Sequence, residues 1–335
     1  MKFLDLFAGI GGFRLGMESA GHECVGFCEI DKFARASYKA IHNTENEVEM
    51  HDITTVSDEF IRGIGDIDVI CGGFPCQAFS IAGKRRGFED TRGTLFFEIA
   101  RFASILRPKY LFLENVKGLL NHEGGATFET ILRALDEPGY DVEWQVLNSK
   151  DYVPQNRERV FIVGHLGGER IRKIFPFERE NQTDAENDIK QINDSKKTRE
   201  LLNFDSTNRF YDISGISPCL NTMQGGDREP KIAVPVLTPD RLEKRQNGRR
   251  FKNDGDEMFT LTAQDRHGIL VREEQAVVTD NYRIRKLTPR ECWRLQGFPD
   301  WAFDRAKEVN SDSQLYKQAG NSVTVPVIAD IAKRL

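Results

Sequence analysis

The 335-residue chain has no apolar run long enough to cross a membrane, which takes about 20 residues as a helix. It begins with the strand-like MKFLDLFAG, without an apolar stretch followed by a small-residue cleavage site. We therefore expect no secretory signal peptide, and a protein that works in the cytoplasm.

Paired metal-ligand motifs are also absent. The six cysteines include no Cys-x-x-Cys pair, and the six histidines include no His-x-x-x-His. A structural zinc site is therefore not expected, and we predict no bound metal. In a reducing compartment most of these cysteines should be ordinary core residues.

A net positive charge, common in proteins that bind nucleic acids, is missing as well: the formal net charge is −5. The charge is unevenly spread, however. Acidic residues collect at 178–188, and basic residues collect at 83–87, 241–252 and 283–294. Because phosphate binding depends on the local surface, the net charge does not exclude a nucleic-acid partner. Each basic run is equally compatible with an ordinary solvated surface.

What is present, over about the first 165 residues, is an alternation of apolar strands and amphipathic helices. Such a pattern predicts an α/β domain with a mostly parallel sheet and helices on both faces. Ligands of such sheets bind beyond the carboxyl ends of the strands. The segments at those ends are Asp5 to Gly12, Glu29 to Asp31, Gly73 to Gln77 and Glu114 to Val116.

The alternation of apolar strands and amphipathic helices stops near residue 166. Residues 178–200 are polar with little periodicity, which indicates a linker or variable surface. Residues 205–285 form short segments rich in Gly, Thr, Asp and Arg, which we interpret as a small irregular β-rich domain. After it, TPRECWRLQGF (288–298) is helical, and GNSVTVPVIADIAKRL (320–335) is a turn that opens into an apolar helix.

The stretch DLFAGIGGF (5–13) follows a strand and opens a helix, as nucleotide-binding turns do. It is not the dinucleotide fingerprint, because Arg14 occupies the place of the last glycine, and no P-loop is present. Glu29 ends the second strand and can accept hydrogen bonds from ribose hydroxyls, and Asp52 can accept one from an adenine amino group. A ribose and an adenine without a pyrophosphate indicate S-adenosylmethionine. The alternative is a glycine-rich packing turn with an exposed Glu29.

CGGFPCQAFS (71–80) places Cys76 directly after Pro75 at the end of a buried strand. Cysteine attacks as thiolate, and the nearby basic loop together with Arg157 and Arg159 would favour that form. Taken alone, Cys76 is also compatible with a buried, inert thiol.

LFLENVKG (111–118) places Glu114 and Asn115 at the end of another buried strand. A carboxyl group there caps a turn or donates a proton. A cysteine that attacks an electron-poor ring and an acid that protonates that ring form a coherent pair.

These motifs, in this order, resemble those of the bacterial DNA (cytosine-5) methyltransferases of restriction–modification systems. The matching stretches run almost from end to end: DLFAGIGGFRLG, the Glu of CEID, GGFPCQAFSIAGKRRGFEDTRGTLFFEI, PKYLFLENVKGL, DYVPQNRERVFIVG, RKLTPRECWRLQGFP and GNSVTVPV. The divergent stretch lies where that family places its target-recognition domain. GISPCLNTMQGG (215–226) is similar to that domain's Thr-Leu region, with Cys-Leu in its place.

The resemblance implies a Rossmann-like S-adenosylmethionine-dependent catalytic domain at 1–170 and 305–335, and a target-recognition domain with a hinge helix at 171–304. It implies that Cys76 attacks cytosine C6, that Glu114 protonates N3, and that Asn115 positions the segment around Glu114. Arg159 would contact the base near O2, and Arg157 would support the loop and a phosphate. The cofactor residues it implies are Asp5, Phe7, Ile10, Gly12, Glu29, Ile30, Asp52, Ile53, Gly73, Asn321 and Val323, and the loop Gln77 to Gly93 would close over DNA.

The implied activity is methyl transfer from S-adenosylmethionine to C5 of a cytosine flipped out of duplex DNA, in a bacterial or phage protein that acts as a monomer. Rival interpretations are a tRNA cytosine-5 methyltransferase and a non-catalytic DNA-binding relative. The recognised DNA site does not follow from the sequence.

Overall fold

A computed structural model describes residues 1–75, 95–167, 173–177, 210–212, 216–220, 222, 230–235 and 282–335. Cys76, the loop 77–93 and most of the predicted recognition domain lie outside these residues. Among the described helices, none is long and apolar enough to cross a membrane.

In the described part of the chain, seven strands form one sheet in the order β3-β2-β1-β4-β5-β7-β6. The first five in this order are parallel, and β7 runs antiparallel between β5 and β6. The strands are β1 (Lys2–Leu6), β2 (Glu23–Cys28), β3 (Val48–Met50), β4 (Val69–Gly73), β5 (Tyr110–Val116), β6 (Tyr140–Asn148) and β7 (Glu158–Leu166). The mostly parallel sheet confirms the predicted fold class.

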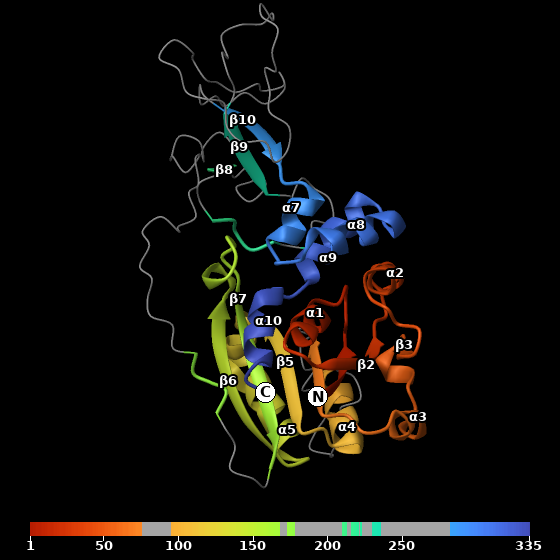
Figure 1. The fold of residues 1–335 in the computed structure, drawn as a ribbon. Helices are drawn as coiled ribbons and strands as arrows, with labels where there is room; N and C mark the ends of the chain where they lie inside the picture. The colour runs from red at the N-terminus through yellow and green to blue at the C-terminus, as the bar shows by residue number, and fades with distance from the viewer. Residues whose placement is uncertain are drawn as a thin grey trace, which may run out of the picture.

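Helices cover both faces of this sheet (Figure 1). One core joins alternate strand residues such as Leu4, Ile70 and Leu111 to α4 (Leu95–Leu106) and α5 (Ala126–Asp136). The other core joins their sequence neighbours, such as Phe3 and Val69, to α1 (Gly12–Ser19) and α10 (Val325–Ala332). The near-continuous apolar strands are needed because both faces of the sheet are buried.

Around these cores lie α2 (Lys32–Ile41), α3 (Asp58–Gly63) and the 3₁₀ helices η1 (Ile53–Thr55), η2 (Lys117–Gly125) and η3 (Ser149–Asp151). Three strands make a second, smaller sheet away from the first: β8 (Phe210–Asp212), β9 (Lys231–Pro235) and β10 (Tyr282–Lys286) (Figure 1).

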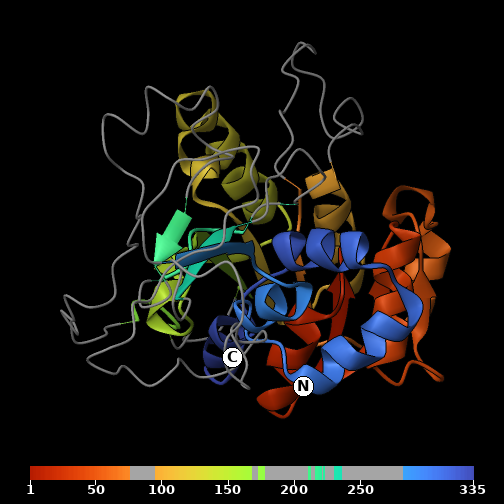
Figure 2. The same cartoon turned by 90° about the horizontal axis from the view of Figure 1, so that it is seen from above.

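Between the two sheets lie α7 (Pro289–Arg294), α8 (Asp300–Val309) and α9 (Asp312–Asn321) (Figures 1 and 2). Trp293 and Phe298 form the centre of their core. Arg305 donates to the carbonyl of Ile41 at 2.8 Å, which fastens α8 to the end of α2. The chain therefore returns from the small sheet onto the first 50 residues, and α8 runs unbroken through residues 304 and 305, the predicted domain boundary.

Candidate active site

A cavity of about 380 Å³ lies beyond the carboxyl ends of β1, β2, β4 and β5. This is the edge of the sheet where the sequence predicted a ligand, and the volume is typical of small-molecule sites. Ten of the predicted site residues line it: Phe7, Ile10, Gly12, Glu29, Gly73, Glu114, Arg157, Arg159, Asn321 and Val323.

The turn between β1 and α1 requires its glycines. Gly11 has φ of 85°, and a Cβ on it would lie 2.1 Å from Nε2 of His42. A Cβ on Gly12 would lie 2.8 Å from the side chains of Ser322 and Val323. Gly11 therefore makes room for His42, and Gly12 lets Ser322 and Val323 approach the turn between β1 and α1. Two distant parts of the sequence thus line the same cavity.

Glu29 stands at one end of the cavity, where β2 stops. One carboxylate oxygen accepts from the backbone N–H of Gly9, and the other accepts from that of Asp31, both at 2.7 Å. Burial raises the pKa of Glu29, and the two backbone donors oppose that rise. Glu29 is thus held rigidly against the glycine turn.

Four of the predicted cofactor residues do not line the cavity: Asp5, Ile30, Asp52 and Ile53. Asp5 is fully buried, and it accepts a hydrogen bond from the Tyr38 hydroxyl at 3.4 Å. Burial raises its pKa well above the usual range. Ile30 is 68% exposed beside Glu29, and the Asp52 side chain accepts from the backbone N–H of Thr54 at 3.0 Å.

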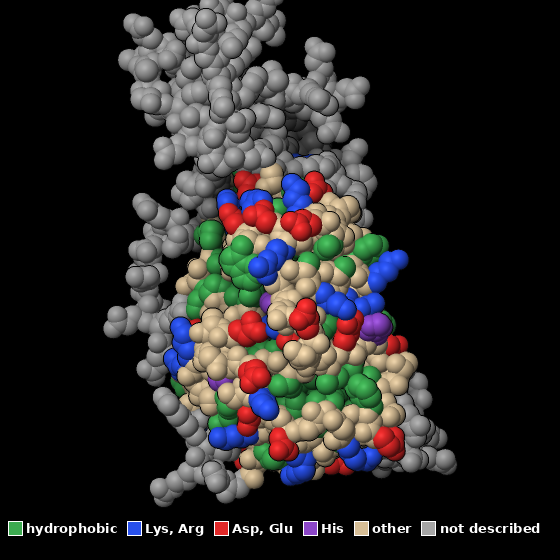
Figure 3. All heavy atoms as spheres, turned by 45° about the vertical axis from the view of Figure 1, so that its right-hand side comes forward, with side chains coloured by type: hydrophobic (Ala, Val, Ile, Leu, Met, Phe, Trp, Pro, Cys, Tyr) green, Lys and Arg blue, Asp and Glu red, His purple; other side chains and the backbone are tan. Residues whose placement is uncertain are grey.

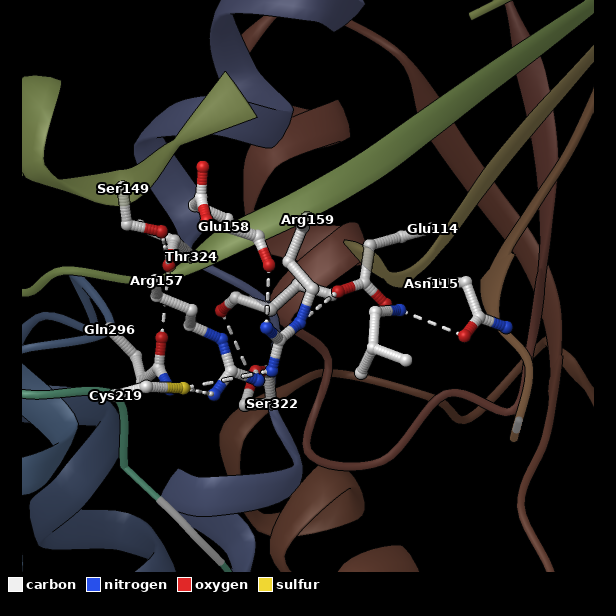
Figure 4. A network of polar contacts seen from close by, with 12 residues as sticks. Glu114, Asn115, Ser149, Arg157, Glu158, Arg159, Cys219, Gln296, Ser322 and Thr324 are labelled. Carbon is white, nitrogen blue, oxygen red and sulfur yellow. Dashed lines mark hydrogen bonds and ion pairs between the residues drawn. The ribbon is translucent and has the colours of Figure 1, made fainter. Parts of the chain in front are cut away.

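Glu114 lies at the opposite end, near the end of β5. Antiparallel pairing of β5 with β7 sets Val116 opposite Arg159, so the arginine reaches back to the carboxylate. Arg159 Nε lies 3.0 Å from Glu114 Oε1 (Figure 4). Burial raises the pKa of Glu114 above its usual value, against the opposing charges of Arg159 and Arg157. Burial thus shifts this carboxyl group toward its protonated form, and the two arginines oppose the shift.

Asn115 connects this acid to the segment that leads to Cys76. Its Nδ2 donates to the carbonyl of Phe74 at 2.9 Å, and its Oδ1 accepts from the backbone N–H of Val116. Phe74 and Pro75 line the cavity. The two residues that precede Cys76 in the sequence therefore belong to the cavity wall.

Arg157 is 3% exposed, and no carboxylate accepts its described hydrogen bonds. Its guanidinium donates to the carbonyls of Leu220, Gly320 and Ser322. Burial and the neighbouring Arg159 lower the pKa of Arg157. The arginine therefore connects its own strand to two other segments, which the sequence did not identify.

The sequence also missed Lys317, Gln318 and Ser322, which line the cavity. Lys317 Nζ pairs with the Asp31 carboxylate at 2.6 Å. One signal was available, since Lys317 precedes Asn321 by four residues on α9 and so shares its face of the helix. Ser322 belongs to GNSVTVPV, the same motif as two predicted residues.

Among the described side chains, the basic runs do not form a positively charged surface for DNA. Runs 83–87 and 241–252 lie outside the described residues. In the third run, Arg290 pairs with Asp304, and Arg294 pairs with Asp300. On the side that carries α2 and α3, the coloured acidic and basic side chains intermix (Figure 3).

No group of three or more metal-ligating side chains that could hold a metal ion occurs among the described residues. Of the cysteines in the described part of the chain, Cys24, Cys28, Cys71 and Cys292 are buried, as predicted, and Cys219 is exposed.

Comparison with known proteins gives matches over the whole chain. The family described as C-5 cytosine-specific DNA methylase matches residues 1–335. Orphan methyltransferase M.SPRI of Bacillus phage SPR is 36% identical, with 100% of this chain and 97% of the relative covered. Type II methyltransferase M.HhaI of Haemophilus parahaemolyticus is 37% identical, with 99% and 93% covered. The crystal structure of S. pombe Dnmt2 methyltransferase superposes with a TM-score of 0.65 at 19% identity, covering 98% of this chain and 96% of that chain, which bears on the fold alone.

Proposed function

The chain belongs to the C-5 cytosine-specific DNA methylases, and from this we propose that it transfers the methyl group of S-adenosylmethionine to a cytosine flipped out of duplex DNA. One observation carries the proposal. A single cavity joins the glycine turn and Glu29 at one end to the buried Glu114 and Arg159 at the other. A cofactor and a base can therefore meet inside it.

The residues around the cavity fit S-adenosylmethionine. The glycine turn exposes backbone, and Phe7, Ile10 and Val323 supply apolar walls. Glu29 offers carboxylate oxygens for ribose hydroxyls, and the exposed Ile30 beside it offers an apolar surface for the adenine. Asp52 and Ile53 would hold the adenine edge, and Asn321 and Gly73 would complete the wall. Asp5 would act from beneath the turn, because it is fully buried.

The bound cofactor would supply an electrophilic methyl group on a sulfonium. Cytosine C5 is a poor nucleophile, so the Cys76 thiolate first adds to C6 and makes C5 enamine-like. Glu114 hands its proton to N3 as the addition proceeds, a role that is helped by the burial that raises its pKa. Arg159 pairs with Glu114 and so holds the carboxyl group in place. It would also contact the base near O2. After C5 takes the methyl group, water takes the proton from C5, Cys76 leaves C6 as thiolate, and N3 returns its proton to the Glu114 carboxylate, which restores the ring.

The C6 edge of a stacked cytosine is out of reach, so the base must leave the helix, at a cost of a few kcal/mol. We propose that residues 171–304 recognise DNA and that the loop 77–93 closes over it, offsetting that cost through phosphate and base contacts. Residues 1–170 and 305–335 form the catalytic domain in this proposal. Since one chain supplies the whole cavity, we propose a monomer that works in the cytoplasm of a bacterium or in phage infection, within or beside a restriction–modification system.

The test is incorporation of tritiated methyl groups from S-adenosylmethionine into duplex DNA and into tRNA by the purified protein. The expected result is labelled DNA and unlabelled tRNA, and bisulfite sequencing of that DNA would identify the methylated cytosine. Labelled tRNA alone would favour the RNA methyltransferase, and no label in either would favour the non-catalytic relative. Neither rival is supported by the whole-chain family match.

A further inference from the structure

Two segments from distant parts of the sequence meet at Arg157. The cofactor turn, residues 320–323, comprises the last two residues of α9 and the two that follow, and it lines the cavity. The recognition segment, residues 216–220, lies within the part of the chain predicted to recognise DNA. The two segments are about 100 residues apart in sequence, so a contact between them links the two proposed ligands.

The Arg157 guanidinium divides its donors between these segments (Figure 4). Nη1 donates to the carbonyl of Leu220 at 3.2 Å and to the Cys219 sulfur at 3.4 Å. Nη2 donates to the carbonyls of Ser322 at 2.7 Å and Gly320 at 3.2 Å. Each terminal nitrogen thus serves one segment.

The recognition segment is also tied to the residues just before Arg157. Ser217 N–H donates to Pro154 O at 2.7 Å, and Asn156 N–H donates to Ser217 O at 2.8 Å. Leu220 N–H donates to the Gln155 side chain at 3.1 Å. The backbone N–H groups in these hydrogen bonds can therefore report whether the recognition segment is docked. Docking of this segment also positions the guanidinium that holds the cofactor turn.

An arginine suits this place because its donors form a rigid planar fork. All four acceptors are uncharged carbonyl or thiol groups, so a buried cation depends on both sets at once. When a ligand orders one segment, the guanidinium is held in the orientation that its hydrogen bonds to the other segment require. A lysine keeps the charge but carries its three donors on a single nitrogen, so it lacks the two separate terminal nitrogens that serve the two segments.

We propose that Arg157 is a positioning residue that couples cofactor binding to docking of the recognition segment, and hence to DNA binding. This inference rests on the proposed function. Coupling is reciprocal, so cofactor strengthens DNA binding by the factor with which DNA strengthens cofactor binding.

The test is amide hydrogen exchange of the full-length protein with and without S-adenosylhomocysteine, after calorimetry has confirmed binding of this probe. We expect the probe to slow exchange of the amides of Ser217, Leu220 and Asn156 by about fivefold or more, the lower range of site–site coupling. In Arg157→Lys we expect less than about twofold slowing under saturating probe.

Arg334→Lys is the matched control. Arg334 also donates to a carbonyl, that of Ile174 at 2.9 Å, and Ile174 belongs to neither segment. This variant should show the full slowing. Arg157→Gln, whose side chain is shorter, is a second variant in case Arg157→Lys does not fold. The comparison of wild-type protein with and without the probe tests the coupling itself and needs no variant.

The outcomes separate the two proposals. No binding of the probe to wild-type protein would overturn the proposed function and this inference with it. Binding without slowed exchange at residues 216–220 would overturn the inference alone. Full slowing in a folded Arg157 variant would overturn the assignment to Arg157.

Discussion

Replacing Glu114 by Gln tests the buried carboxyl group with little change in its shape. Glu114 is 8% exposed and lies 3.0 Å from Arg159, and burial raises its pKa. A Gln cannot transfer an acidic proton to the base. We therefore expect a rate loss on the order of 10²–10⁴, the range for a positioned general acid. This corresponds to about 3–5 kcal/mol of transition-state stabilisation, at 1.36 kcal/mol per decade.

The assay is single-turnover methyl transfer to duplex DNA at saturating enzyme, with S-adenosylhomocysteine affinity and thermal unfolding measured in parallel. Glu158→Gln is the matched control, because Glu158 neighbours Arg159 on β7 but pairs at the surface with Lys117. It should keep close to wild-type rate, and Glu114→Gln should keep its affinity for the probe.

The pH dependence of the methyl-transfer rate gives a second test of Glu114, because the direction of the change is predicted. The protonated carboxyl group is the active form, so its contribution is present below the pKa of Glu114 and is lost as pH rises through that raised value. Glu114→Gln should lack this decline of the rate. A loss of tenfold or less, or an unchanged decline in the variant, would refute the assignment of Glu114 as the acid.

Three further predictions follow from the site and the fold. Cys76→Ala should abolish turnover in the tritium assay but keep S-adenosylhomocysteine affinity, and a variant that still methylates DNA would remove the covalent mechanism. Gly72→Ala should lower the free energy of unfolding by about 1–3 kcal/mol or more, because its Cβ would lie 2.0 Å from the carbonyl oxygen of Leu6. Gly63→Ala, with open space at the end of α3, should instead raise it by about 0.4–1 kcal/mol, and denaturant titration of both checks the pair. DNA affinity should fall with salt at a log–log slope of about −0.9 per neutralised phosphate, and a flat response in filter binding would mean that the basic runs do not contact DNA.

The fold class and the edge of the sheet that carries the site follow from local patterns. Buried parallel strands need apolar runs, and polar residues such as Glu29 and Glu114 stand out where those runs stop. The glycine turn is likewise visible, because its backbone angles exclude most side chains.

Contacts between distant segments do not follow from such patterns. Asp5 sits among these polar strand ends in sequence, yet it is fully buried against Tyr38. Lys317 becomes part of the cavity through its pairing with Asp31, 286 residues away. Arg157, expected to support the loop and a phosphate, donates to carbonyls of two other segments that no sequence pattern connects to it. Such roles depend on packing between parts of the chain that no local period encodes.

Covalent trapping on duplex DNA that contains 5-fluorocytosine tests the central claim most directly, since fluorine at C5 blocks release of the enzyme after methyl transfer. With S-adenosylmethionine present, peptide mapping should find the modified base bonded to the sulfur of Cys76, and none in its absence or in Cys76→Ala. An adduct on another residue would contradict the account, and so would a protein that methylates ordinary DNA but leaves no trapped enzyme on the 5-fluorocytosine DNA.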